Sequence, residues 1–140
     1  MTDPDAIDWP RLQEAAVAAL DSSYSPYSHF PVGVAGFTEE GRLVWGANIE
    51  NASYGITLCA ECSMVSHLFA TGGGRLIAVW CVDGTGATLM PCGRCRQLLY
   101  EHGGPDMLLM TPDGVRTMAQ MLPQAFGPHH LEEARESGSR

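Results

Sequence analysis

The sequence contains no lysine and few basic residues of any kind. Its eight cationic side chains are all arginines, set against 16 acidic residues, which gives a net charge of −8 over 140 residues. Because this charge repels polyanions, binding to nucleic acid or to an anionic membrane surface is not expected. No apolar run approaches the length of a membrane span, and the acidic N-terminus lacks the apolar core of a secretory signal. We therefore expect a cytoplasmic protein.

The remaining composition is that of an ordinary globular protein. Hydrophobic residues make up 45% of the sequence and charged residues 17%. A chain of 140 residues can bury a core without needing disulfides. We predict a single domain over residues 1–140, with a polar C-terminal tail over about residues 129–140, which we expect to fray from Glu132.

Predicted helices and strands alternate along the chain. Apolar residues at helical spacing predict helices over 8–21, from about 58 to the glycines at 72–74, over 92–102 and over 118–122. Strands are predicted over 30–37, 42–48, 75–82, 107–111 and 115–117, the first two forming a hairpin. This order indicates a three-layer α/β/α domain around a mixed sheet of about five strands.

Four of the five cysteines form two Cys-x-x-Cys pairs. Cys59 and Cys62 form one pair, and Cys92 and Cys95 form the other about thirty residues later. In a protein without secretory features this spacing indicates a metal site rather than a disulfide framework, and we expect zinc. Spacing alone leaves two possibilities: a closed structural site with four sulfurs, or an open site with three sulfurs and one position for water.

The residues around the cysteines favour the open site. Cys92 and Cys95 lie three residues apart at the start of a predicted helix, where they can share one metal and where the helix dipole favours thiolates. Cys59 would be the third ligand, with Glu61 two residues further on. The order thiolate, one residue, glutamate and then Pro-Cys-x-x-Cys is the signature of zinc deaminases, in which the glutamate is an acid and base rather than a ligand.

Five motifs occur in order between about residue 24 and residue 126. They are Tyr27-Ser-His-Phe-Pro-Val-Gly33, Gly46-Ala-Asn-Ile-Glu-Asn-Ala-Ser-Tyr54, Cys59-Ala-Glu61, Pro91-Cys-Gly-Arg-Cys-Arg-Gln97 and Leu122-Pro-Gln-Ala-Phe126. With these motifs the sequence resembles the small homotetrameric cytidine deaminases of pyrimidine salvage, which implies zinc-dependent deamination of cytidine and deoxycytidine to uridine and deoxyuridine. Blasticidin-type deaminases are similar around the zinc, but the second and fifth motifs fit the cytidine enzymes better.

The resemblance also implies roles for individual residues around the metal. Cys59, Cys92 and Cys95 would hold one zinc per subunit, with water as the fourth ligand. Glu61 would carry protons from that water to the pyrimidine ring and to the departing ammonia. A carboxylate in this role needs a pKa matched to the task.

The implied substrate contacts come from two subunits, so that activity would depend on the tetramer. Asn48 and Glu50 resemble the pair that hydrogen-bonds the ribose, and Phe30 resembles the aromatic that packs on the pyrimidine. The other implied contacts are Tyr54, Ala60 and Phe126, of which Tyr54 and Phe126 match residues that reach a neighbouring subunit's site.

One position departs from the family pattern. Cys62 stands where many members have an arginine that helps to neutralise the thiolates. Arg96 matches a second such arginine, and we predict that it donates to a zinc-bound sulfur, with Arg94 as a weaker candidate. Cys62 could be a fourth ligand in a non-catalytic protein or a redox-active thiol. The fifth cysteine, Cys81, lies in an apolar run and is interpreted as a small buried hydrophobic residue.

Overall fold

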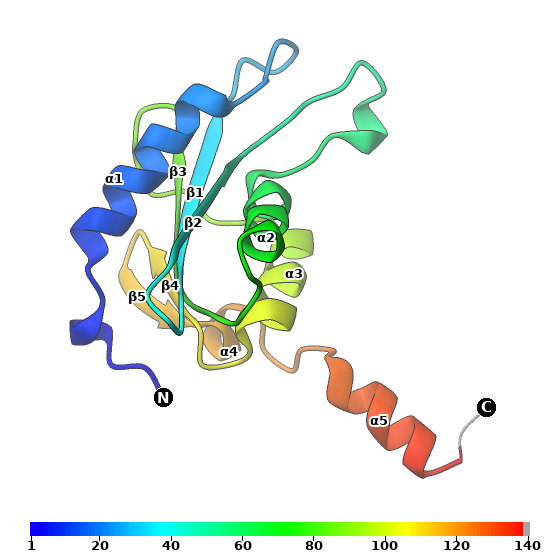
Figure 1. The fold of residues 1–140 in the computed structure, drawn as a ribbon. Helices are drawn as coiled ribbons and strands as arrows, with labels where there is room; N and C mark the ends of the chain where they lie inside the picture. The colour runs from blue at the N-terminus through cyan, green and yellow to red at the C-terminus, as the bar shows by residue number, and fades with distance from the viewer. Residues whose placement is uncertain (139–140) are drawn as a thin grey trace.

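The computed structural model describes residues 1–138 and is organised around one five-stranded sheet (Figure 1). The strand order is β2-β1-β3-β4-β5. Strands β3 and β4 are parallel and the other neighbouring pairs are antiparallel, so the sheet is mixed as predicted. The strands are β1 (Val32–Thr38), β2 (Leu43–Ala47), β3 (Leu76–Asp83), β4 (Leu108–Thr111) and β5 (Gly114–Thr117).

Helices cover both faces of the sheet and complete the predicted three layers. One face carries α1 (Trp9–Ala19), and the other carries α2 (Ala60–Ala70) and α3 (Gly93–Gly103) (Figure 1). The short α4 (Met118–Met121) follows β5 and packs against α3. Within residues 1–138 none of the helices has both the length and the apolarity needed to span a bilayer.

Local signals set the first helix and the hairpin as expected. The side chain of Asp8 caps α1 by accepting a hydrogen bond from the Arg11 backbone N–H at 3.1 Å, and Pro10 occupies the first turn. The helix ends at Ala19 and continues to residue 22 as a 3-10 turn. Between β1 and β2, Gly41 adopts a φ of +83°, which a residue with a side chain rarely adopts.

The sheet separates two clusters of buried apolar side chains. Along β3 the side chains alternate, so that Val79 and Cys81 face the cluster beneath α2 and α3, whereas Trp80 and Val82 face the cluster beneath α1. Alternation of this kind follows from the two-residue period of a strand. The strand predicted over residues 75–82 is thus present as β3, and it is covered on both faces.

The polar C-terminal segment contains a helix that was not predicted. This helix, α5 (Pro128–Glu136), extends away from the sheet and its flanking helices (Figure 1). Pro128 opens the helix, and His130 Nδ1 accepts a hydrogen bond from the Gly127 N–H at 3.1 Å. This local cap gives the segment a helical start although none of its residues is buried. The last two residues of the predicted tail lie outside the described residues.

Helix α2 lies against β2 at a distance that only glycine permits. A Cβ atom on Gly46 would lie 2.3 Å from the backbone N of Met64 and 2.5 Å from the carbonyl O of Ala60. These are backbone atoms of a helix, so they cannot yield as the end of a flexible side chain could. Gly46 therefore fixes where the N-terminal half of α2 lies.

Gly46→Ala is expected to lower the free energy of unfolding by about 1–3 kcal/mol, because the added methyl group pushes α2 off the sheet. Denaturant titration followed by circular dichroism measures this change. Gly55→Ala is the matched control, since nothing lies within 4 Å of a Cβ atom at that position. Equal stability of the two variants would contradict the close approach at Gly46.

Candidate metal centre and active site

Three cysteines meet at the N-terminal ends of α2 and α3. Cys59 is the N-cap of α2, Cys92 is the N-cap of α3, and Cys95 lies in the first turn of α3. Their sulfur atoms all lie within 4.8 Å of one another. In the described part of the chain no other group of three or more His, Cys, Asp or Glu ligand atoms comes together in this way. The structure therefore brings together three of the cysteines singled out in the sequence.

The pKa values of the three thiols are shifted in different directions by burial and by their contacts with one another. Burial raises the pKa of Cys59, and burial together with the charge of Glu61 raises the pKa of Cys95. Burial also acts against ionisation of Cys92, but hydrogen bonds from Cys95 and Cys59 outweigh it and lower the pKa of Cys92. Three sulfurs this close cannot all become thiolates without a cation. A set of three thiolates at two helix N-termini fits zinc, which favours sulfur donors.

Glu61 lies beside this cluster in the first turn of α2. Its side chain is 4% exposed, and it is the only buried Asp or Glu among residues 1–138. Its charge contributes to the raised pKa of Cys95, which places the carboxylate next to the sulfurs. Its Oε1 accepts a hydrogen bond from the thiol of Cys81 at 3.1 Å. A buried carboxylate thus lies next to the cysteine cluster, at the position where the sequence predicted an acid and base.

Cys62 does not belong to the cluster. It is half-buried on α2, and its backbone N–H donates to the Cys59 carbonyl at 3.0 Å as part of the helix start. The group of mutually close ligand atoms found in residues 1–138 contains Cys59, Cys92 and Cys95 but not Cys62. The geometry therefore favours an open site of three cysteines over a closed site of four.

Arg96 is hydrogen-bonded to two backbone carbonyl groups, and its predicted donation to a zinc-bound sulfur stays a prediction. Its Nε donates to the carbonyl of Pro91 at 2.9 Å and its Nη1 to the carbonyl of Met121 at 3.1 Å. No hydrogen bond joins Arg96 to a cysteine sulfur within the residues that the structure describes. The guanidinium instead ties the residue before Cys92 to the C-terminal end of α4. Arg94 is exposed and contributes its backbone amide, which lowers the pKa of Cys92.

Asn48 fastens the loop that leads into β1. Its Oδ1 accepts from the Val32 backbone N–H at 2.9 Å, and its Nδ2 donates to the carbonyl of Phe30 at 2.9 Å. Both ends of the amide are thus used to hold the segment that carries Phe30. The position of this aromatic ring, predicted to pack on the pyrimidine, depends on Asn48.

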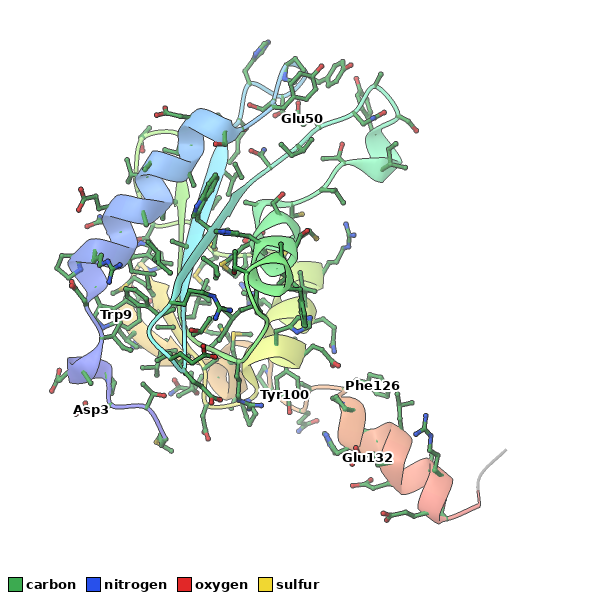
Figure 2. The ribbon with its side chains drawn as sticks, viewed as in Figure 1. Asp3, Trp9, Glu50, Tyr100, Phe126 and Glu132 are labelled. Carbon is green, nitrogen blue, oxygen red and sulfur yellow. The ribbon has the colours of Figure 1, made fainter. Side chains whose placement is uncertain are left out.

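Glu50 holds the same loop at Tyr27 and Ser28, a few residues before the segment that Asn48 binds. Its Oε1 accepts from the backbone N–H groups of Tyr27 and Ser28 at 3.0 and 3.1 Å, and its Oε2 accepts from the Ser28 hydroxyl. The hydrogen bond from the Ser28 side chain, with the two backbone bonds, lowers the pKa of Glu50. The carboxylate is therefore ionised near neutral pH and lies at one end of the molecule (Figure 2).

The remaining predicted contacts do not meet within one chain. Phe126 lies at the opposite end of the molecule from Glu50 (Figure 2), and its side chain is 58% exposed. Tyr54 is 74% exposed and contacts Tyr27 edge to face, with ring centroids 5.8 Å apart. Ala60 is buried at the start of α2. An isolated chain therefore assembles the cysteine cluster and Glu61 but leaves Phe126 far from the Glu50 loop.

Sequence analysis missed the role of Cys81. The residue is fully buried as predicted, but its thiol also donates to Glu61, which was not foreseen. Because Cys81 is an isolated cysteine within an apolar strand, no local pattern distinguishes it from a packing residue. The contact could be predicted only from the packing of the sheet, which places the face of β3 that carries Val79 and Cys81 beneath α2.

The fold and the site together define a class of enzyme. A three-layer α/β/α domain that presents three thiols and one buried glutamate at two adjacent helix N-termini is a zinc-dependent hydrolytic deaminase domain. The family model of the cytidine and deoxycytidylate deaminase zinc-binding region matches residues 9–111. The chain belongs to this family, and zinc is its cofactor.

Individual relatives agree with this assignment. The chain is 52% identical over 132 residues to a cytidine deaminase from Mycobacterium tuberculosis, covering 94% of this chain and 98% of the relative. It is 40% identical over 132 residues to a cytidine deaminase from Halalkalibacterium halodurans, covering 91% and 100%. The crystal structure of a cytidine deaminase from Mycobacterium leprae superposes with a TM-score of 0.83 at 71% identity, covering 84% of this chain and 99% of that chain.

Zinc affinity is expected to rise with pH across the neutral range. The raised pKa values of Cys59 and Cys95 keep these thiols protonated in the metal-free protein, so binding must release their protons. Lower pH therefore opposes binding and higher pH favours it. Competition against a chromophoric chelator at several pH values measures the effect. An affinity that does not change with pH would show that the ligands are already ionised.

Cys62→Ala is expected to retain one zinc per chain, because the sulfur of Cys62 lies outside the cluster. The matched variant Cys95→Ala removes one of the three clustered ligands and is expected to lose its zinc on dialysis. Elemental analysis of the dialysed proteins measures both contents. Loss of zinc from Cys62→Ala as well would instead indicate the closed site of four cysteines.

Proposed function

We propose that the protein is a cytidine deaminase that hydrolyses cytidine and deoxycytidine to uridine and deoxyuridine with release of ammonia. The observation that carries this proposal is the buried carboxylate of Glu61 beside three clustered cysteine sulfurs. The 52% identity to a cytidine deaminase over 94% of the chain supports a pyrimidine nucleoside as the substrate.

In the proposed reaction Glu61 moves protons between water and substrate. Cys59, Cys92 and Cys95 would hold the zinc, which would supply a Lewis acid that makes water easier to deprotonate. A carboxylate oxygen of Glu61 takes a proton from the attacking water and donates it to the ring nitrogen beside the carbon that carries the amine, which makes that carbon more electrophilic. Glu61 then transfers the second water proton to the amine. Ammonia leaves, and the water oxygen remains as the new carbonyl.

Glu50 is proposed to bind a ribose hydroxyl. A carboxylate offers about four acceptor sites, and the loop donors from Tyr27 and Ser28 use three of them. One site is thus left for a hydroxyl donor from the sugar. Asn48 would complete the pair, and Phe30, 50% exposed on the same loop, would pack against the pyrimidine. A base without ribose would leave this acceptor unpaired on binding, which favours the nucleoside.

A nucleoside without phosphate groups fits the charge of the protein. The chain carries a net charge of −8, and its cations are eight arginines with no lysine. Arg96 directly follows Cys95 in the sequence, and its guanidinium donates hydrogen bonds to two carbonyl groups. A phosphorylated substrate or nucleic acid would meet electrostatic repulsion from such a chain.

The proposed assembly is a homotetramer in which neighbouring subunits complete each site. The separation of Phe126 from Glu50 and the exposure of Phe126 and Tyr54 support this arrangement. Aromatic residues are enriched at protein–protein interfaces. We further propose that residues 1–140 form one domain and that the enzyme acts in the cytoplasm, in pyrimidine salvage, where its products can re-enter nucleotide synthesis.

The proposal is tested by ultraviolet detection of uridine formed from cytidine by the zinc-loaded protein. Glu61→Gln is expected to lower kcat by about 10²–10⁴-fold, because the proton carrier is lost. Its zinc content and oligomeric mass, measured by elemental analysis and light scattering, should match those of the wild type. A wild-type protein that holds zinc and assembles but deaminates only blasticidin, or neither substrate, would contradict the proposal.

A further inference from the structure

The thiol of Cys81 reaches the carboxylate of Glu61 from the central strand of the sheet. The Cys81 Sγ lies 3.1 Å from Glu61 Oε1, with Cys81 fully buried and Glu61 4% exposed. This is a close approach for a sulfur donor, and it joins two residues separated by 20 positions in the sequence. The contact connects β3 directly to the first turn of α2.

The proton of this hydrogen bond belongs to sulfur. Burial raises the pKa of Cys81 well above its usual range, and the adjacent charge of Glu61 raises it further. Cys81 therefore remains a thiol at neutral pH and acts as the donor. A buried carboxylate needs such a donor, because an unpaired charged oxygen inside the protein costs far more than one in water.

The donor is held more rigidly than the acceptor. Cys81 lies in the middle of β3, paired with Val34 of β1, and its carbonyl accepts from the Leu89 N–H at 3.0 Å. Glu61, in contrast, has a long side chain whose rotamers must be fixed by something outside α2. The sheet supplies that constraint through Cys81.

We propose that Cys81 is a positioning residue for the deamination, whose thiol holds Oε1 of Glu61 and leaves Oε2 available for proton transfer. This inference rests on the proposed role of Glu61 as the proton carrier. A thiol is a weak hydrogen-bond donor. It can therefore fix the orientation of the carboxylate while taking little from the basicity that the reaction needs, which a hydroxyl or guanidinium donor would reduce more.

The first test compares variants that differ only in the donor. Cys81→Ala is expected to lower kcat for cytidine by about five- to tenfold, with KM within about twofold and the zinc content unchanged. Cys81→Ser restores a donor and is expected to return kcat to within about threefold of the wild type. If Cys81→Ala does not fold, Cys81→Val also removes the donor and leaves no cavity.

Val79→Ala is the matched control. Val79 is fully buried on the same face of β3, two residues before Cys81, so this variant also removes buried volume beneath α2 and α3. It is expected to lower stability but to retain the wild-type kcat. Wild-type kcat in both Cys81→Ala and Cys81→Val, or an equal loss of kcat in Val79→Ala, would overturn the positioning role.

A spectroscopic measurement tests the contact without catalysis. In zinc-loaded Cys62→Ala protein the clustered cysteines are thiolates, so Cys81 carries the only S–H group. Its infrared S–H stretching band is expected at the low frequency of a hydrogen-bonded thiol and should move to the free-thiol frequency in Glu61→Ala. If the frequency of this band is the same in Glu61→Ala as in the protein with Glu61, the inference is overturned. Failure of the wild type to deaminate cytidine would instead refute the proposed function, since the band reports the contact alone.

Discussion

The close approach of α2 to the sheet at Gly46 is the constraint on which the site depends. With no side chain between them, the backbone of the helix can lie against β2 near Ala60 and Met64. This places the first turn of α2, with Glu61, over the face of β3 that carries Cys81. It also brings the N-terminal end of α2 next to that of α3, so that Cys59 meets Cys92 and Cys95. A displacement of α2 would separate the metal ligands from one another and Glu61 from its donor.

The site gathers groups that become negative in a chain that is already acidic. Three thiols and one carboxylate lie together, and the guanidinium of Arg96 is hydrogen-bonded to two backbone carbonyl groups. The protein itself offers the N-terminal dipoles of two helices, which favour anions but do not supply a full charge. Metal binding and thiol ionisation are therefore coupled, because the cation provides the compensation that the side chains do not.

The chemistry and the substrate contacts are built differently. The cysteine cluster and Glu61 are attached to helices and a central strand, and burial holds them in place. Asn48 and Glu50 hold a loop in place, and most of their hydrogen bonds are made to backbone groups of that loop. The polar residues of the loop thus have a structural role that does not compete with the proposed binding role. A rigid reaction centre with adaptable loop contacts is a common division in enzymes.

The sequence by itself determined the order of helices and strands, the hairpin, the metal-binding character of the cysteine motifs and the family. These features depend on residues within one helical turn, one strand or one motif, and such patterns can be read along the chain. Tertiary structure alone decided that Cys62 lies outside the cluster, that Arg96 binds the carbonyls of Pro91 and Met121, and that Cys81 donates to Glu61. Arg96 and Met121 lie 25 positions apart, and Cys81 and Glu61 lie 20 positions apart. Whether such groups meet is decided by how α2, α3 and the sheet pack together, and no local pattern in the sequence encodes that geometry.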